Sequence, residues 1–348
     1  MTKPQHQIIT PRQLRDEMIL SIKAGNATLA LSGPGIGKTS IGEQVAEFLE
    51  LKFRDFRGST SDPTELFGYQ APDIPARKLV HCMPEILPTE NDPPTLVYLD
   101  EINTGTQSQM NALLGFLNEG RVGLYKLASH HAVAGAGNLA EHGAAVQEIP
   151  MPLVTRVESY FIEPDLREWK EDFAFRANIH SDVLAHLNLF PDHFWKPDYD
   201  AEDCTSHANP RTWEIASRKC HAIDAMPELA KGSEIPRFVG IVGPETGESF
   251  AGTRASRADL VSPLEALLNP DSARVPETQA AKYIISCALA AIANDENLAG
   301  LIRYCERVGP EYIAVAMRDA SRRNPQITEN YEFQKWISKN SEIFNNQF

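Results

Sequence analysis

Apolar residues recur at helical spacing between Leu14 and Ile22. Thr10 and Pro11 precede this segment, and a threonine followed by proline is a typical N-cap and first-turn pair. The pattern therefore predicts an amphipathic helix that ends near Gly25.

Short apolar runs then alternate with helical patterns through the first half of the chain. The runs cover residues 27–31, 96–99, 132–136 and 157–162. Helical patterns follow the first run and recur at residues 104–118 and beyond residue 165. Alternation of this kind predicts an α/β fold in which helices flank a parallel sheet.

Two segments fit poorly as simple βα units, and we interpret them as insertions. Residues 68–94 are rich in proline. Residues 120–131 form a glycine-flanked apolar stretch that is typical of a hairpin.

Strand patterns fade after Pro164, and helical patterns dominate the rest of the chain. A composition shift near residues 252–275 precedes a helix expected from about Pro276 to Ala293 and two shorter amphipathic helices. We therefore expect an α/β core at residues 1–164, a helical lid domain at 165–260 and a C-terminal helical region at 261–348.

Composition narrows the class of protein. The 348 residues are 42% hydrophobic, which excludes a disordered chain, and the longest apolar run, residues 283–293, is too short to span a membrane. The net charge of −14 disfavours sequence-independent nucleic-acid binding, which needs a field of basic residues. Five widely spaced cysteines without a CxxC pair, and a start without a secretory signal, predict a cytoplasmic protein without a disulfide framework or zinc site.

The glycine-rich segment from Ser32 to Thr39 lies between the first predicted strand and the next helix. Backbone N–H groups converge on phosphate oxygens in such a loop. Lys38 would neutralise the β- and γ-phosphates of a nucleotide, and Thr39 would ligate Mg²⁺. Ser32 replaces the first glycine of the strict GxxxxGK[ST] pattern, and the alternative is a tight turn that opens a helix. The candidate nucleotide-binding residues are Gly33, Pro34, Gly35, Ile36, Gly37, Lys38, Thr39 and Ser40.

Two carboxylates, Asp100 and Glu101, end the apolar run that begins near residue 95. Asp100 would hold the magnesium ion, and Glu101 would orient and deprotonate the attacking water. The alternative is a surface pair that caps the next helix. No NKxD motif follows, so a guanine-specific switch protein is disfavoured.

The order of these sequence motifs resembles the order found in AAA+ ATPases, and most closely that of the MoxR-type branch. The resemblance covers about residues 8–225. It is carried by the glycine-rich loop and by the phrases at Asp62–Gly68, Leu99–Asn103, Asn111–Arg121 and Pro152–Glu158.

The resemblance implies roles for three further residues. Asn138 would be the sensor-1 residue, Arg156 the arginine finger that reaches the γ-phosphate of a neighbouring subunit, and Arg211 the sensor-2 residue of the lid. From the residues alone, Asn138 could close a strand into a turn and Arg156 could be a surface arginine. Asn209 and Pro210 are a helix start on local grounds, which leaves Arg211 unexplained.

By this resemblance the chain would be an ATPase that uses ATP and Mg²⁺. The family likeness also implies a homo-oligomeric ring, a hexamer, that remodels or activates a protein client. A partner with a von Willebrand factor A-type or metallopeptidase-like domain is implied. The resemblance also implies that the hairpin and the insertion at residues 68–94 face a central pore or a client, which makes Leu124, Tyr125 and Lys126 candidate contact residues. Two alternatives stay open: a nucleic-acid-stimulated motor or restriction-type translocase subunit, and a nucleotide-gated scaffold with little turnover.

Overall fold

The chain divides into two compact units, Met1–Asp165 and Leu166–Phe348, each of which is described by itself. The boundary falls next to Pro164, where the strand patterns fade in the sequence. The structure is a computed structural model that describes residues 8–58, 64, 68–122, 125–139, 147, 149, 156–197 and 206–346. Leu124, residues 62–63 and 65–67 and residues 152–155 lie outside this described part.

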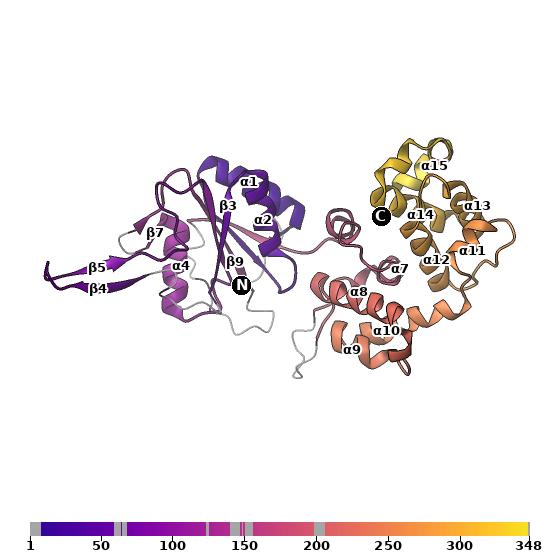
Figure 1. Cartoon of the computed structure of the whole chain (residues 1–348), viewed down its shortest axis with the longest axis horizontal. Coiled ribbons are helices and arrows are strands. Elements are labelled where there is room, and N and C mark those ends of the chain that lie inside the picture. Colours follow the sequence, from indigo (N-terminus) through magenta and orange to yellow (C-terminus); the bar gives the residue numbers. More distant parts are fainter. Residues whose placement is uncertain are drawn as a thin grey trace. The chain divides into compact units, whose positions relative to one another are not determined.

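A six-stranded sheet forms the centre of the first unit (Figure 1). Every neighbouring pair in it is parallel. The spatial order is β1-β10-β2-β9-β6-β3. The strands are β1 (Ile8–Ile9), β2 (Thr28–Ser32), β3 (Lys52–Arg57), β6 (Thr95–Asp100), β9 (Ala132–Asn138) and β10 (Glu158–Ile162). This arrangement confirms the predicted α/β fold with a parallel sheet.

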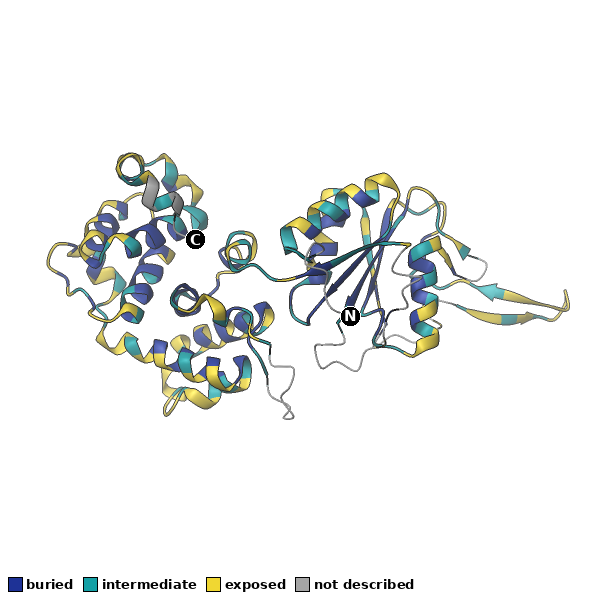
Figure 2. Ribbon diagram, turned by 180° about the vertical axis from the view of Figure 1, so that it is seen from behind, coloured by how far each residue is buried: buried dark blue, intermediate teal, exposed yellow. Residues whose placement is uncertain are grey.

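Helices cover both faces of the sheet. Helix α4 (Gln107–Glu119) packs its apolar side on residues such as Val97 and Leu99 of β6. Tyr98, which points to the opposite face because side chains alternate along a strand, lies against α2 (Lys38–Phe48). Helix α1 (Pro11–Ala24) packs beside α2. Figure 2 shows the resulting buried strands and the exposed outer sides of these helices.

Burial of the central strands explains why their apolar runs are clear in the sequence. Every residue of β2 and of β6 is buried, so both appear as continuous apolar runs. Strand β3 is different, because it lies at the edge of the sheet and buries only Phe56. Its alternation of charged and aromatic residues hides it from a search for apolar runs.

Both predicted insertions contain hairpins. Strands β7 (Arg121–Val122) and β8 (Tyr125–Lys126) pair antiparallel, which confirms the hairpin expected in residues 120–131. Strands β4 (Tyr69–Asp73) and β5 (Lys78–Cys82) form a second, unpredicted hairpin that projects from the unit (Figure 1). Proline within its first strand argued against a strand there, and Pro72 is accommodated because this ribbon has only two strands.

The second unit is helical and has one continuous hydrophobic core. Side chains from residues 165–260 and from 261–348 both contribute to this core, in which helices α7 and α12 pack closely. No helix among the described residues is long and apolar enough to cross a membrane. The longer helices are α7 (Ser181–Leu189), α8 (Pro210–Ala225), α9 (Ile235–Val242), α10 (Pro244–Ala255), α12 (Gln279–Ala291), α13 (Leu298–Val308), α14 (Pro310–Arg323) and α15 (Tyr331–Asn346). Two short helices, α6 (Leu166–Glu168) and α11 (Pro263–Leu268), also lie in this unit.

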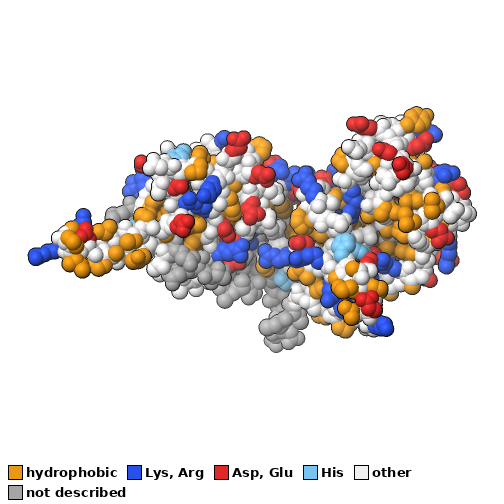
Figure 3. Space-filling view, viewed as in Figure 1, with side chains coloured by type: hydrophobic (Ala, Val, Ile, Leu, Met, Phe, Trp, Pro, Cys, Tyr) orange, Lys and Arg blue, Asp and Glu red, His pale blue; other side chains and the backbone are white. Residues whose placement is uncertain are grey.

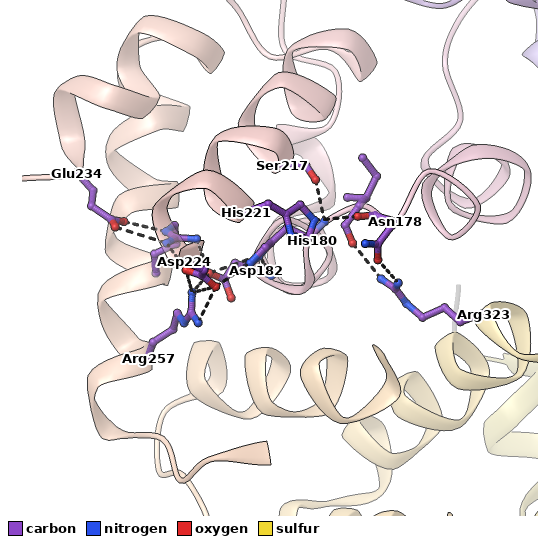
Figure 4. Close-up of polar contacts among 11 residues, drawn as sticks. Asn178, His180, Asp182, Ser217, His221, Asp224, Glu234, Arg257 and Arg323 are labelled. Carbon is purple, nitrogen blue, oxygen red and sulfur yellow. Dashed lines mark hydrogen bonds and ion pairs between the residues drawn. The ribbon is translucent and has the colours of Figure 1, made fainter. Parts of the chain in front are cut away.

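An ionic network ties several of these helices together (Figure 4). Asp182 of α7 accepts hydrogen bonds from Arg254 at 2.6 Å and from Arg257 at 3.0 Å. Burial of Asp224 raises its pKa, but hydrogen bonds from His180 and Arg257 outweigh burial and hold that pKa below its usual value. Arg254 of α10 pairs with Asp182 of α7 and Asp224 of α8, so the network links these three helices.

Candidate active site

The glycine-rich loop joins β2 to α2 at the carboxyl end of the sheet. Gly35 and Gly37 have φ angles of 83° and 97°, a left-handed conformation that favours glycine. Ser32 ends β2 and is not among the residues with positive φ, so the missing first glycine leaves the loop geometry intact. Gly33, Pro34 and Ile36 complete the loop, and Ser40 lies in the first turn of α2. In a loop of this kind, the backbone N–H groups and the N-terminus of the following helix, here α2, face the position of a bound phosphate.

Lys38 contacts the end of the neighbouring strand. Its Nζ donates to Ser32 Oγ at 2.9 Å, to the Gly33 carbonyl at 3.1 Å and to Asn138 Oδ1 at 3.0 Å. Ser32 and Asn138 are register partners on β2 and β9, which is why residues far apart in sequence meet here. The predicted phosphate-binding lysine and the predicted sensor-1 residue thus lie side by side.

Thr39 and Asp100 also meet at this edge. The Thr39 hydroxyl donates a hydrogen bond to Asp100 Oδ2, and Asp100 Oδ1 accepts one from the Glu101 amide at 2.8 Å. A hydroxyl and a carboxylate are oxygen ligands of the kind that Mg²⁺ prefers, and this ion is commonly held by few protein groups. The residues present therefore fit the expected magnesium site.

Tyr98 holds the start of α2, a role that no pattern in the sequence indicates. Its hydroxyl donates to the Lys38 carbonyl at 2.9 Å. Its ring leaves no room for a side chain at position 42, because a Cβ on Gly42 would lie 2.7 Å from the ring. Burial raises the pKa of Tyr98 well above its usual value, so the hydroxyl keeps its proton and remains a donor. The start of α2 is thereby fixed to the strand that carries Asp100.

Glu101 has a φ of 52°, a conformation that is uncommon for residues other than glycine. The loop around it is closely packed, since Gly58 donates its amide to the Asp100 carbonyl at 2.9 Å. A Cβ on Gly58 would lie 2.7 Å from the Glu101 carbonyl oxygen. Backbone conformations of this kind are strained and occur mainly at functional sites, where contacts with the surrounding structure maintain them.

Replacing Gly58 by alanine is expected to displace Glu101 and to lower the expected ATP turnover, because the new methyl group would lie 2.7 Å from the Glu101 carbonyl oxygen and 3.4 Å from Leu113 Cδ1. Gly115→Ala is the matched control, since a Cβ there meets nothing within 4 Å and alanine favours the helix by up to about 1 kcal/mol. Steady-state rates and melting temperatures of both variants test this. An active Gly58→Ala protein would refute the proposed packing constraint.

Arg156 does not join this cluster. It is exposed and precedes β10, whose first residue, Glu158, is the register partner of Thr28 at the start of β2. Thr28 and Ser32 are four residues apart, or about 13 Å along the strand. Arg156 lines a shallow pocket of about 320 Å³ at this opposite end of the sheet, together with Asn26. Its guanidinium therefore lies outside the reach of its own glycine-rich loop.

Arg211 lies in the second unit, exposed in the first turn of α8. Asn209 caps this helix by accepting from the Thr212 amide at 3.0 Å, and Pro210 is its first residue, as the sequence predicts. This local geometry accounts for Asn209 and Pro210. Because each unit is described by itself, the role of Arg211 stays a prediction.

Residues 2–144 match the family model described as the MoxR domain in the MoxR-vWA-beta-propeller ternary systems. A Lon protease homolog 4 of Arabidopsis thaliana, chloroplastic/mitochondrial, is 43% identical over 79 residues, which are 22% of this chain and 8% of that protein. The chain thus spans less than a tenth of this curated relative.

Two solved structures align with low similarity. A candidate ATPase from Cytophaga hutchinsonii ATCC 33406 has 14% identity and a TM-score of 0.35, with 96% of this chain and 89% of that chain covered. A RuvB mutant from Thermotoga maritima has 13% identity and a TM-score of 0.38, with 75% and 76% covered.

The family match and the parallel sheet with its glycine-rich loop define the first unit as a P-loop domain of the AAA+ class. Within that class it is a MoxR-type domain, which confirms the resemblance seen in the sequence for residues 2–144.

Proposed function

We propose that the protein is a Mg²⁺-dependent ATPase that hydrolyses ATP at the interfaces of a homo-oligomeric ring. The contact between the Thr39 hydroxyl and the Asp100 carboxylate carries this proposal. It joins the glycine-rich loop to the carboxylate strand at the point where a nucleotide-bound metal is expected.

The chain's own residues divide the work. The loop amides and Lys38 bind the phosphates, and Asn138 contributes a polar group beside them. Glu101 orients a water molecule and accepts its proton as that water attacks the γ-phosphorus. Thr39 and Asp100 would hold Mg²⁺, which when bound neutralises charge on the phosphate oxygens.

The position of Arg156 supports the proposal that ATP is hydrolysed between subunits. It is exposed at the end of the sheet opposite its own loop, so it serves a nucleotide only if that nucleotide is bound to another copy of the chain. A guanidinium supplied in this way stabilises the charge of the transition state. Assembly into a ring, in the manner of a hexamer, would then be a condition of activity. Arg211 would contribute a second guanidinium from the helical unit.

The work of the ring is proposed to be remodelling or activation of a protein client. The β4–β5 hairpin supports this, because its large apolar residues are exposed and basic side chains lie at its tip (Figure 3). The exposed residues are Tyr69, Ile74, Leu79, Val80 and Met83. The family description supports a von Willebrand factor A-type partner, whereas a metallopeptidase-like partner rests on resemblance alone.

The shorter hairpin is a weaker candidate for client contact. Tyr125 is half-buried, and its hydroxyl donates to the Pro88 carbonyl at 2.7 Å while its ring packs near Phe116. This side chain therefore supports the fold of the insertion. Lys126 is exposed and stays available for contact.

Replacing Lys38 by methionine, which keeps most of the side-chain volume, is expected to weaken ATP binding at least about tenfold, because a charge-assisted contact to phosphate is lost. Calorimetric titration with ATP measures the change. Lys52→Ala, at an exposed lysine of the edge strand, is the control and should bind as the parent does. Unchanged affinity in the Lys38 variant would exclude the loop as the phosphate site.

A further inference from the structure

Asn103 lies just after Glu101 and is almost completely buried, with 2% of its surface exposed. Its side-chain amide makes two hydrogen bonds to the backbone of Asn138. Asn138 donates its N–H to Asn103 Oδ1 at 3.0 Å, and Asn103 Nδ2 donates to the Asn138 carbonyl at 2.7 Å. The side chain of Asn103 thus bonds both backbone groups of Asn138, as a neighbouring strand would.

The position of this pair explains why a side chain is needed. The ladder between β6 and β9 ends at Leu99 and Gly135, followed by one bond from the Ile102 amide to the Ala136 carbonyl. Asn138, the last residue of β9, lies beyond the end of this ladder, and its backbone N–H and C=O groups face the β6 side of the sheet. Without the amide of Asn103, its backbone groups would lack these two bonds.

The packing around the amide is close. A Cβ on Gly137 would lie 2.9 Å from Asn103 Oδ1, so a larger residue there would push the amide away. The Asn103 carbonyl also accepts a hydrogen bond from the Gln147 amide at 2.8 Å. Asn103 Nδ2 donates a further one to the Gln147 carbonyl at 3.3 Å. These contacts leave the amide of Asn103 little freedom to turn.

We infer that Asn103 is a positioning residue, which holds Asn138 so that the Oδ1 atom of Asn138 faces Lys38 and the expected γ-phosphate. This inference rests on the proposed ATPase function. Asn103 sits on the same loop as Asp100 and Glu101, so it ties the sensor-1 residue to the carboxylates that handle metal and water. It acts through Asn138 and does not itself touch the nucleotide.

A double-mutant cycle in the full chain tests this role. Asn103→Ala should lower kcat about tenfold with little change in KM, because a displaced Asn138 fails mainly in the transition state. Asn138→Ala should lower kcat at least as far, and the double variant should be no slower than Asn138→Ala alone. Multiplying losses in the double variant would show that Asn103 acts independently, which overturns the inference.

A second variant keeps the shape of the side chain and adds a pH dependence. In Asn103→Asp, a carboxylate oxygen would face the Asn138 carbonyl, whereas the protonated acid can donate to it as the amide does. Burial disfavours the charged form and raises the carboxyl pKa. The kcat of this variant, divided by that of the parent, should therefore rise as pH falls from about 8 to about 6. A ratio independent of pH would contradict the pairing.

Two controls separate the possible failures. Thr95→Val removes one partly buried hydrogen bond, from Thr95 Oγ1 to the Pro93 carbonyl at 2.7 Å, at the other end of β6, and it should leave kcat unchanged. If Glu101→Gln removes hydrolysis but the Asn103 variants turn over at the parental rate, the proposed function stands and the positioning role is wrong. If the parent protein itself hydrolyses no ATP, the proposed function fails, whatever the Asn103 variants do.

Discussion

Glu101→Gln is expected to lower ATP hydrolysis by a factor of about 10² to 10⁴, the range over which a positioned general base acts. The substitution keeps the size of the side chain but removes its capacity to accept a proton. ATP binding should persist, because Lys38 and the loop amides are unchanged. Single-turnover rates and equilibrium titration with a fluorescent ATP analogue distinguish the two effects.

Glu43→Gln provides the matched control for this experiment. Glu43 is exposed on α2, so the same chemical change there should leave the rate unaltered. Parental turnover in the Glu101 variant would mean that another group activates the water. Loss of nucleotide affinity would instead mean that Glu101 shapes the loop.

Arg156→Ala should lower hydrolysis by about 10³ to 10⁵, the effect expected when an arginine finger is removed. The variant should bind ATP with parental affinity, because Arg156 lies at the opposite end of the sheet from its own loop. Turnover and ATP affinity are measured at a protein concentration at which the parent is assembled. Sedimentation confirms that the variant assembles equally well.

Arg15→Ala controls for the loss of a surface arginine from the same unit, and its rate should match that of the parent. Arg15 makes an ion pair with neighbouring Asp16 at 2.8 Å and lies on α1. Near-parental turnover of Arg156→Ala would exclude the arginine from catalysis.

The fold was predictable where burial imposes a simple pattern. Strands β2 and β6 are wholly buried, so their apolar runs stand out. Strand β3 was not predictable in this way, because it lies at the sheet edge and carries charged residues. The β4–β5 hairpin was missed because Pro72 within β4 argues against a strand. The sequence also predicted two shorter helices after α12, whereas the structure has three α-helices there, α13, α14 and α15.

The site was predictable where its residues belong to short motifs. Lys38, Thr39 and Asp100 are brought together by the parallel strand order, as their positions at strand ends suggest. Tyr98 and Gly58 could not be assigned from the sequence, because their roles depend on contacts across the sheet. A tyrosine in an apolar run looks like a core residue until its hydroxyl partner is known.

Mixing two inactive variants tests the central claim, that each site is completed by Arg156 of a neighbouring copy. Arg156→Ala retains Glu101, and Glu101→Gln retains Arg156, so an equal mixture should assemble sites with both groups at about a quarter of its interfaces if copies mix at random. We predict ATP turnover near that fraction of the parental rate. Turnover no higher than the average of the two separate variants, in rings shown to contain both, would contradict the account.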